Sequence, residues 1–239
     1  MNFSQGINER YSSTKSLTLI GHRICPYVQR VVITLEELGL DYDKVDINLS
    51  EKPPWLKHYS PGEKVPVLTE SGSGVLFDSE VICEYLYNKY DEQRYSVKSL
   101  EKANHQAWCK YSSEILNRFA QLIYSAKDNE AIDRQLFDIR ASIQQLTISN
   151  FKTPYFSGDQ FSIVDAHFAP LFRYICFFGE TLSYDFIGPR SHLLVWIKKV
   201  LERNSVASSV PVSYNRELTD LIMPLNPLLY KRIRSPHER

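Results

Sequence analysis

The sequence predicts a small α/β domain, residues 16–90, followed by an all-helical domain, residues 99–239. Three observations lead to this fold class. Strand-like runs and helical repeats alternate as far as Tyr90, the polar stretch 91–98 then reads as a linker, and no strand signal follows it. Residues 1–15 are polar, and we expect a flexible tail there.

The first domain opens with a strand–helix–strand unit. Residues 16–22, "SLTLIGH", form a short β-like run, and apolar residues then repeat at helical spacing from Val28 to Leu38. Gly39 can supply the left-handed end of that helix. Because residues 41–49 alternate as a second strand, the segment predicts two parallel strands joined by a crossover helix.

A proline-rich stretch, residues 51–64, predicts a loop or a broken helix. The runs 65–70 and 74–78 flank a turn-rich "SGSG" and predict a β-hairpin. Ser79 then opens a helix that ends near Tyr90.

The second domain carries four apolar stripes at helical spacing. They lie at residues 108–122, 132–146, 161–178 and 193–201. The third stripe begins with Ser162-x-x-Asp165, which has the form of a capping box with a shorter acid than usual. We expect short helical pieces in the tail, residues 211–239.

Composition excludes several classes of function. Lys plus Arg equals Asp plus Glu at 28 each, so charge gives no reason to expect nucleic acid or an anionic membrane as a partner. No apolar run is long enough to span a bilayer, and the N-terminus lacks the apolar core of a signal peptide. We therefore expect a cytoplasmic protein with four free thiols. His105 and Cys109 make only half a metal site, so we expect no metal.

Cys25 is the strongest chemical signal. Pro26 suits a first helical position, so Cys25 would cap the helix and face its unpaired N–H groups. Thiols placed in this way titrate at about 3.5 to 7.5 rather than at about 8.5. A dithiol oxidoreductase would carry a second cysteine at position 28, where this chain has Val28. A mixed disulfide on Cys25 would then need an external thiol to resolve it.

Four motifs in this order resemble the cytosolic glutathione transferase family. They are Cys25-Pro26-Tyr27, Val65-Pro66, Asp78-Ser79 and Ser162-Ile163-Val164-Asp165. The resemblance covers residues 17–203, and the cysteine together with "INLSEKPPW" looks most like the omega-type and related bacterial branches. It implies a thioredoxin-like N-terminal domain and an all-α C-terminal domain.

The resemblance implies glutathione as co-substrate and assigns residues to it. Asp78 would pair with the γ-glutamyl amine, and Ser79 with its helix N-terminus would hold the γ-glutamyl carboxylate. The main chain at Val65, before a cis Pro66, would pair with the cysteinyl backbone, and Lys52 would meet the glycine carboxylate. Asp78 is one methylene shorter than the family's usual Glu, which weakens the amine contact.

A second-substrate pocket is expected between the domains. Its candidate residues are Tyr27, Trp108, Tyr111 and Tyr174, although helical aromatic residues are more often core than pocket. The resemblance also implies a homodimer. The substrate would be a small electrophile or a disulfide.

The leading hypothesis is a glutathione-dependent thiol transferase or reductase in which Cys25 is the single catalytic cysteine. Candidate reactions are deglutathionylation and the reduction of dehydroascorbate or of glutathionyl quinone adducts. One alternative is conventional conjugation of glutathione to electrophiles, in which a hydroxyl such as that of Tyr27 would activate the bound thiol. The other is a non-catalytic adaptor of the stringent starvation protein type, since a fold does not fix a function.

Overall fold

The structure is a computed structural model that describes residues 15–91, 99–146, 152–188 and 191–234. The predicted tail and linker fall almost wholly outside these residues, so both stay predictions. The chain divides into two compact units, residues 1–102 with 208–210 and residues 103–207 with 211–239.

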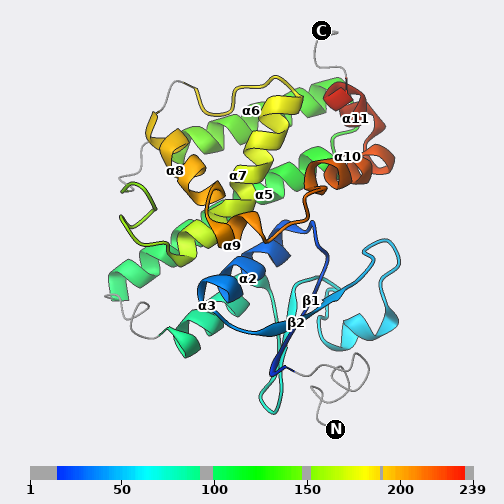
Figure 1. Cartoon of the computed structure of the whole chain (residues 1–239). Coiled ribbons are helices and arrows are strands. Elements are labelled where there is room, and N and C mark those ends of the chain that lie inside the picture. The colour runs from blue at the N-terminus through cyan, green and yellow to red at the C-terminus, as the bar shows by residue number, and fades with distance from the viewer. Residues whose placement is uncertain (1–14, 92–98, 147–151, 189–190, 235–239) are drawn as a thin grey trace. The chain divides into compact units, whose positions relative to one another are not determined.

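The first unit is built on a four-stranded sheet in the order β2-β1-β3-β4 (Figure 1). Its strands are β1 (Leu17–Gly21), β2 (Tyr42–Asp46), β3 (Val67–Glu70) and β4 (Gly74–Phe77). β1 and β2 are parallel and are joined through helix α2 (Pro26–Glu37), whereas β3 runs antiparallel to both β1 and β4. The predicted crossover unit and hairpin are therefore confirmed.

Two further helical segments complete the first unit. The predicted loop 51–64 contains a short 3-10 helix, η1 (Pro54–His58). Helix α3 (Ser79–Tyr90) begins where the sequence predicts, and the residue that caps it is Asp78. Asp78 Oδ1 accepts hydrogen bonds from the N–H groups of Glu80 at 2.9 Å and Val81 at 3.3 Å.

In the part that the structure describes, the second unit consists of helices joined by loops (Figure 1). The four predicted helices are present as α5 (Ser99–Tyr124), α6 (Asn129–Leu146), α7 (Ile163–Thr181) and α8 (Ser191–Leu201). Three short helices follow, α9 (Asn204–Ala207), α10 (Tyr214–Leu225) and α11 (Pro227–Arg234). The last two lie within residues 211–239 and confirm the helical pieces expected in the tail. No helix among the described residues is long and apolar enough to cross a bilayer.

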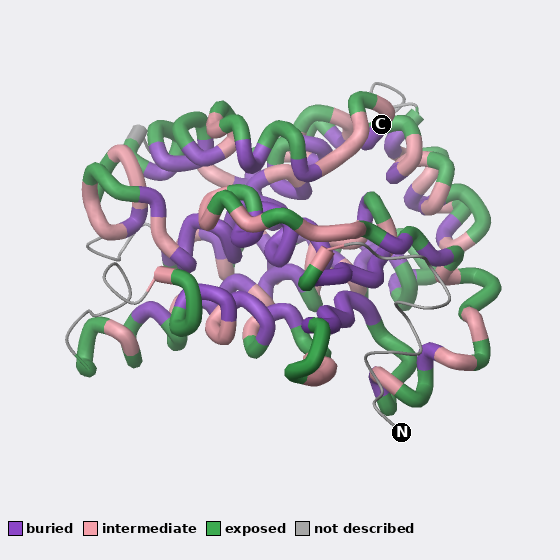
Figure 2. The backbone as a smooth tube through the Cα atoms, turned by 60° about the horizontal axis from the view of Figure 1, so that its bottom comes forward, coloured by how far each residue is buried: buried purple, intermediate pink, exposed green. Residues whose placement is uncertain are grey.

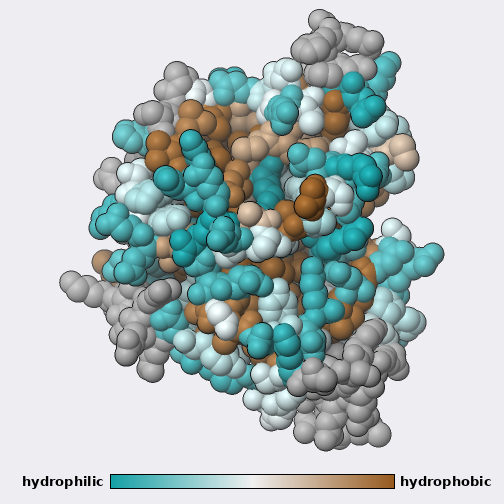
Figure 3. Space-filling model, in the orientation of Figure 1, coloured by the Kyte–Doolittle hydropathy of each residue, from teal (hydrophilic) through white to brown (hydrophobic). Residues whose placement is uncertain are grey.

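Burial follows the predicted stripes. In Figure 2 the buried residues lie along the inward faces of the helices, and α7 is buried along most of its length. Figure 3 shows apolar side chains gathered at the surface over α8, where Leu194 and Val195 are exposed.

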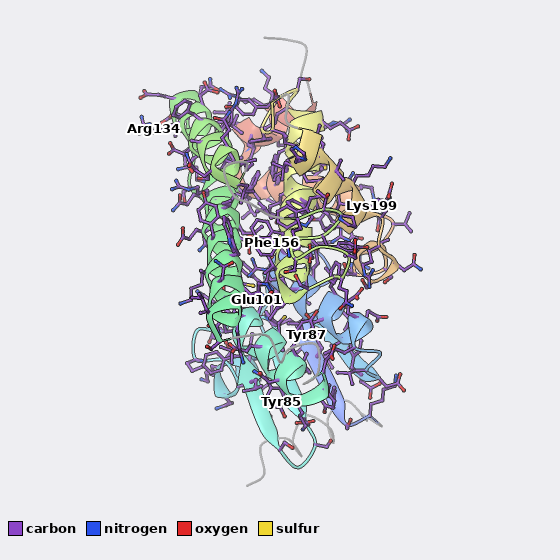
Figure 4. All side chains as sticks on the ribbon, turned by 90° about the vertical axis from the view of Figure 1, so that its left-hand side faces the viewer. Tyr85, Tyr87, Glu101, Arg134, Phe156 and Lys199 are labelled. Carbon is purple, nitrogen blue, oxygen red and sulfur yellow. The ribbon has the colours of Figure 1, made fainter. Side chains whose placement is uncertain are left out.

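Asp165 joins three parts of the second unit. Its Oδ2 accepts hydrogen bonds from Ser162 N at 2.8 Å and Ser162 Oγ at 2.6 Å, as a capping residue does. Its Oδ1 accepts from Phe156 N at 2.9 Å and from Trp196 Nε1 at 2.6 Å. Phe156, labelled in Figure 4, packs in turn against Trp108 of α5. The predicted capping box is therefore present, and its acid also ties α8 and the loop before α7 to the start of α7.

Glu70 makes a comparable junction in the first unit, at the end of β3. Its carboxylate accepts hydrogen bonds from Tyr85 and Tyr90, the latter at 2.5 Å, and both oxygens lie 2.7 Å from Lys89 Nζ. All three partners belong to α3; Tyr85 is labelled in Figure 4. Burial raises the pKa of Glu70, but the hydrogen bonds from Lys89, Tyr85 and Tyr90 outweigh it and lower the pKa to about 2.

We predict that Glu70→Gln destabilises the protein at neutral pH and less so in acid. A lowered carboxylate pKa stabilises the fold above the unfolded-state value of about 4.3, and this stabilisation is lost as the pH falls toward 2. Lys89 is 40% exposed, so water screens the ion pair. We expect a loss of about 1 kcal/mol at pH 7 that shrinks to about half at pH 3, measured by urea unfolding. Equal losses at both pH values would contradict this account.

We also predict that Asp165→Asn lowers the free energy of unfolding by about 3 kcal/mol. Both carboxylate oxygens of Asp165 accept hydrogen bonds, so the NH₂ group of an asparagine would face donors and leave them without an acceptor. Urea unfolding measures the loss. Asp185→Asn is the matched control, since Asp185 accepts from Ile187 N and Gly188 N in an exposed turn. That control should lose less than about 1 kcal/mol. Similar losses in the two variants would show that Asp165 is not a junction.

Candidate active site

The site begins at Cys25, which stands at the N-cap of α2 as the sequence predicts. Its backbone is extended, with φ −68° and ψ 123°, and Pro26 takes the first helical position. The Cys25 N–H donates to His22 O at 2.9 Å, and the Cys25 carbonyl accepts from Gln29 N at 3.0 Å. The turn after β1 and the first turn of α2 therefore fix the position of the thiol.

The surroundings of the Cys25 sulfur both favour and oppose the thiolate. Burial raises the pKa of Cys25, while the backbone N–H groups of Val28 and Tyr27 and the charge of Arg30 lower it. Burial prevails, and the side chain makes no capping hydrogen bond of normal geometry. The prediction that the helix cap lowers this pKa below the ordinary thiol value is therefore wrong, because the sequence pattern cannot reveal how deeply the sulfur is covered.

Val28 has a structural role in place of a redox one. It is buried, and a Cβ placed on Gly21 would lie only 2.6 Å from Val28 Cγ1. The end of β1 and the first turn of α2 thus pack so closely that only glycine fits at position 21.

All four cysteines are free, as predicted. Cys83 is fully buried on α3, and its Sγ lies 3.3 Å from Thr34 Oγ1. Burial raises the pKa of Cys83 to about 12, so it is a poor partner for thiol exchange. Cys109 is buried on α5, and Cys176 is exposed on α7.

The start of α3 supplies the second part of the site. Asp78 is exposed and holds a left-handed backbone conformation, with φ 76°. Its Oδ1 accepts both capping hydrogen bonds, so an added amine would have to approach Oδ2. Ser79 is buried, and its Oγ lies 3.4 Å from Arg30 Nη1.

Arg30 is the site residue that sequence reasoning missed. Its side chain is fully buried, and its guanidinium lies over the Tyr27 ring, with Cζ 5.2 Å from the ring centroid. The one available signal was an arginine within the apolar repeat of the helix that begins at Pro26. The Tyr27 ring therefore packs against the Arg30 guanidinium, and its predicted place at the second-substrate pocket stays a prediction. The two side chains connect Cys25 on α2 with Asp78 and Ser79 on α3, and all of them belong to the first unit.

The other predicted glutathione contacts lie in two loops. The Val65–Pro66 peptide bond is cis, and Val65 is buried directly before β3. Lys52 is exposed between β2 and η1. No contact ties Lys52 to Cys25, so its role in binding stays a prediction.

Three of the four predicted pocket residues lie in the second unit and make packing contacts there. Trp108 packs edge-on against Tyr111, whose hydroxyl donates to Ser142 O at 2.9 Å. Tyr174 is buried, and its ring contacts Phe119 and Phe178. Tyr174 is therefore a core residue, whereas Trp108 and Tyr111 are half-buried, and the role of all three in substrate binding stays a prediction.

His105, which lies four residues before Cys109 and for which no metal role is expected, contacts Ser157. Its Nε2 lies 2.9 Å from Ser157 Oγ. Cys109 Sγ points instead toward Ile163 O, at 4.0 Å.

Comparison with known proteins agrees with this fold. Residues 19–94 match the glutathione S-transferase N-terminal domain. Glutathione S-transferase DHAR2 of Arabidopsis thaliana is 33% identical over 146 residues, which are 61% of this chain and 64% of that protein. Glutathione S-transferase omega-1 of Sus scrofa is 30% identical over 155 residues, 63% of this chain and 64% of that protein. The match thus spans just under two thirds of the length of these curated relatives.

Among solved structures, glutathione transferase Omega 3C from Trametes versicolor has a TM-score of 0.72 and 25% sequence identity, and the alignment covers 87% of this chain and 95% of that one. The sheet order and the helical second unit therefore have a counterpart in a solved omega transferase. Residues 19–94 therefore match the glutathione S-transferase N-terminal domain, and the chain is similar in sequence and fold to omega-type glutathione transferases.

Proposed function

We propose that the chain is a glutathione-dependent thiol transferase or reductase with Cys25 as its single catalytic cysteine. One observation carries the proposal. Cys25 lies at the cap of α2, and the position where a dithiol enzyme has its resolving cysteine is occupied by the buried Val28. Cys83 is buried against Thr34 and cannot readily take that role. A second thiol must then come from outside the chain, and glutathione is a thiol of the right class. The similarity to glutathione S-transferases omega-1 and DHAR2 supports a glutathione-dependent enzyme.

The reaction would have two exchange steps. The Cys25 thiolate attacks the glutathionyl sulfur of a mixed disulfide, a Cys25–glutathione disulfide forms, and the substrate leaves as a thiolate that takes a proton from water. The thiolate of a second glutathione then attacks the glutathionyl sulfur, which releases oxidised glutathione and restores the Cys25 thiolate. One glutathione is consumed for each mixed disulfide: its sulfur is oxidised to the disulfide level as the substrate sulfur is reduced to a thiol. Glutathionylated thiols fit this scheme directly; dehydroascorbate and glutathionyl quinone adducts are the other candidate substrates.

The start of α3 would hold the γ-glutamyl end of glutathione. Ser79 and the helix N-terminus suit the carboxylate, and the buried guanidinium of Arg30 adds positive charge behind Ser79. Asp78 would receive the amine, and the main chain at Val65 would pair with the cysteinyl backbone. Lys52 would meet the glycine carboxylate.

Conventional conjugation is the less favoured alternative. It would need a hydroxyl that stabilises the glutathione thiolate, and Tyr27 is the candidate. Burial raises the pKa of Tyr27, and its ring lies under the Arg30 guanidinium. Burial raises the pKa of Cys25 as well, but a thiol starts from a lower ordinary pKa than a phenol, so Cys25 is the better placed nucleophile. A non-catalytic adaptor is also less favoured, because it would have no need of the thiol that Cys25 places at the helix cap.

A homodimer and a cytoplasmic location remain proposals from the resemblance. In support of the first, Phe77 of β4 and Val81 of α3 are half exposed, and both belong to the first unit. Apolar side chains of this kind are common where two chains associate.

We predict that Cys25→Ser abolishes turnover of a glutathionylated peptide with glutathione, by about 1,000-fold or more, because serine cannot form the mixed disulfide. Mass spectrometry of the wild type after exposure to oxidised glutathione should show the adduct on Cys25. Cys176→Ser is the matched control, since that thiol is exposed and lies in the second unit; it should keep full activity. Undiminished turnover in Cys25→Ser would sink the proposal.

We further predict that alkylation of Cys25 by iodoacetamide accelerates about tenfold per pH unit from pH 6 to pH 8.5, without glutathione present. The reason is that burial holds the pKa of Cys25 above the ordinary thiol value, so the thiolate is the minor form throughout this range. Peptide mass spectrometry at timed intervals gives the rate. A plateau below pH 7.5 would instead indicate a thiolate already formed at neutral pH.

A further inference from the structure

We propose that Arg30 is a positioning residue that couples Cys25 to the start of α3, where the γ-glutamyl end of glutathione would bind. The inference rests on the proposed function and adds a residue to which neither the sequence motifs nor the resemblance assigns a role. It stands on the geometry of one buried guanidinium with contacts on two helices.

Arg30 is a charged residue in the interior of the first unit. Its side chain is among the largest fully buried ones in the described structure, although arginine is almost never fully buried unless it is paired. Removing a guanidinium from water has a high free-energy cost, and its surroundings must offset that cost. A leucine at this position would continue the apolar repeat of α2 without that cost. The charge itself therefore needs an explanation.

The contacts of Arg30 reach residues of both α2 and α3. Its Nη1 lies 3.4 Å from Ser79 Oγ, at the first residue of α3. Its Cζ lies 5.2 Å from the centroid of the Tyr27 ring, two residues after Cys25. A planar guanidinium can hold a hydrogen-bond partner at its edge and an aromatic ring on its face at the same time. Arg30 thus spans the two helix N-termini that form the site.

The positive charge of Arg30 also acts on the Cys25 thiol. The groups around Arg30 and Cys25 are Tyr27 on α2, Asp78, Glu80 and Cys83 on α3, and His22 in the turn before α2. Arg30 is the charged side chain that lowers the pKa of Cys25 against the effect of burial. The two carboxylates act in the opposite sense on Tyr27 and Cys83. Replacing Arg30 would therefore remove the charge that offsets the effect of burial on the Cys25 thiolate.

The test compares Arg30→Met, which removes the charge at similar length, with Arg30→Lys, which keeps it. Lys89→Met is the matched control, because it removes a positive charge from the same unit at a residue that does not influence Cys25. The first measurement is the pH midpoint of Cys25 alkylation by iodoacetamide. The second is the dissociation constant of S-methylglutathione by calorimetry. Neither needs turnover.

In Arg30→Met we expect the alkylation midpoint to rise by about one pH unit, as for loss of a nearby opposite charge. The rate at pH 8 should fall only about threefold, because a more basic thiolate is also more nucleophilic. S-Methylglutathione should bind about fivefold more weakly, since Ser79 loses its partner. Arg30→Lys should restore the midpoint but not the affinity, because an ammonium cannot contact Ser79 and cover the Tyr27 ring together.

A folded Arg30→Met variant with the midpoint and affinity of the wild type would overturn the proposal, and so would an equal shift in Lys89→Met. If Arg30→Met shows no cooperative urea transition, Arg30→Lys decides: an unchanged affinity overturns the proposal, and a weakened affinity with the wild-type midpoint supports it. If the wild type binds no S-methylglutathione, the proposed function fails on its own, and the alkylation midpoint still tests the action of Arg30 on Cys25.

Discussion

The contact between Gly21 and Val28 is the constraint on which the site depends. Gly21 ends β1 and Val28 lies in the first turn of α2, so their packing sets how closely the helix approaches the strand. Any side chain at position 21 would push α2 away from the sheet, since a Cβ there would lie 2.6 Å from Val28 Cγ1. Cys25 lies between the two residues, and its position follows from theirs.

This constraint also explains how a redox motif can lose its second cysteine without losing its geometry. A cysteine at position 28 would have to pack against Gly21 and also take part in thiol–disulfide exchange with Cys25. Val28 only packs against Gly21. The helix is positioned by an apolar contact, so the remaining thiol keeps its place at the cap. Because position 28 supplies no second thiol, the proposed co-substrate has to supply it.

In each unit one buried carboxylate joins segments that are far apart in the sequence. Asp165 joins the loop at Phe156, the start of α7 and Trp196 of α8, and Glu70 joins the end of β3 to the second half of α3. Burial acts to raise the pKa of both acids, but the net shifts are opposite. Burial raises the pKa of Asp165 against its four hydrogen bonds, whereas an ammonium and two phenols hold the pKa of Glu70 low. A nearby cation makes the difference.

The sequence by itself determined the order of the elements, the cap position of Cys25 and the acid of the capping box at Asp165. Each of these follows from local spacing, turn residues or helix-end chemistry, which act within a few residues along the chain. Tertiary structure alone decided the partners of each side chain. It placed Arg30 under Ser79, Trp196 on Asp165 and Tyr174 among core rings, because such contacts join residues that are distant in sequence. The reactivity of Cys25 also depends on tertiary structure. A helix cap favours the thiolate, but the cover over the sulfur comes from the fold, and burial outweighs the cap.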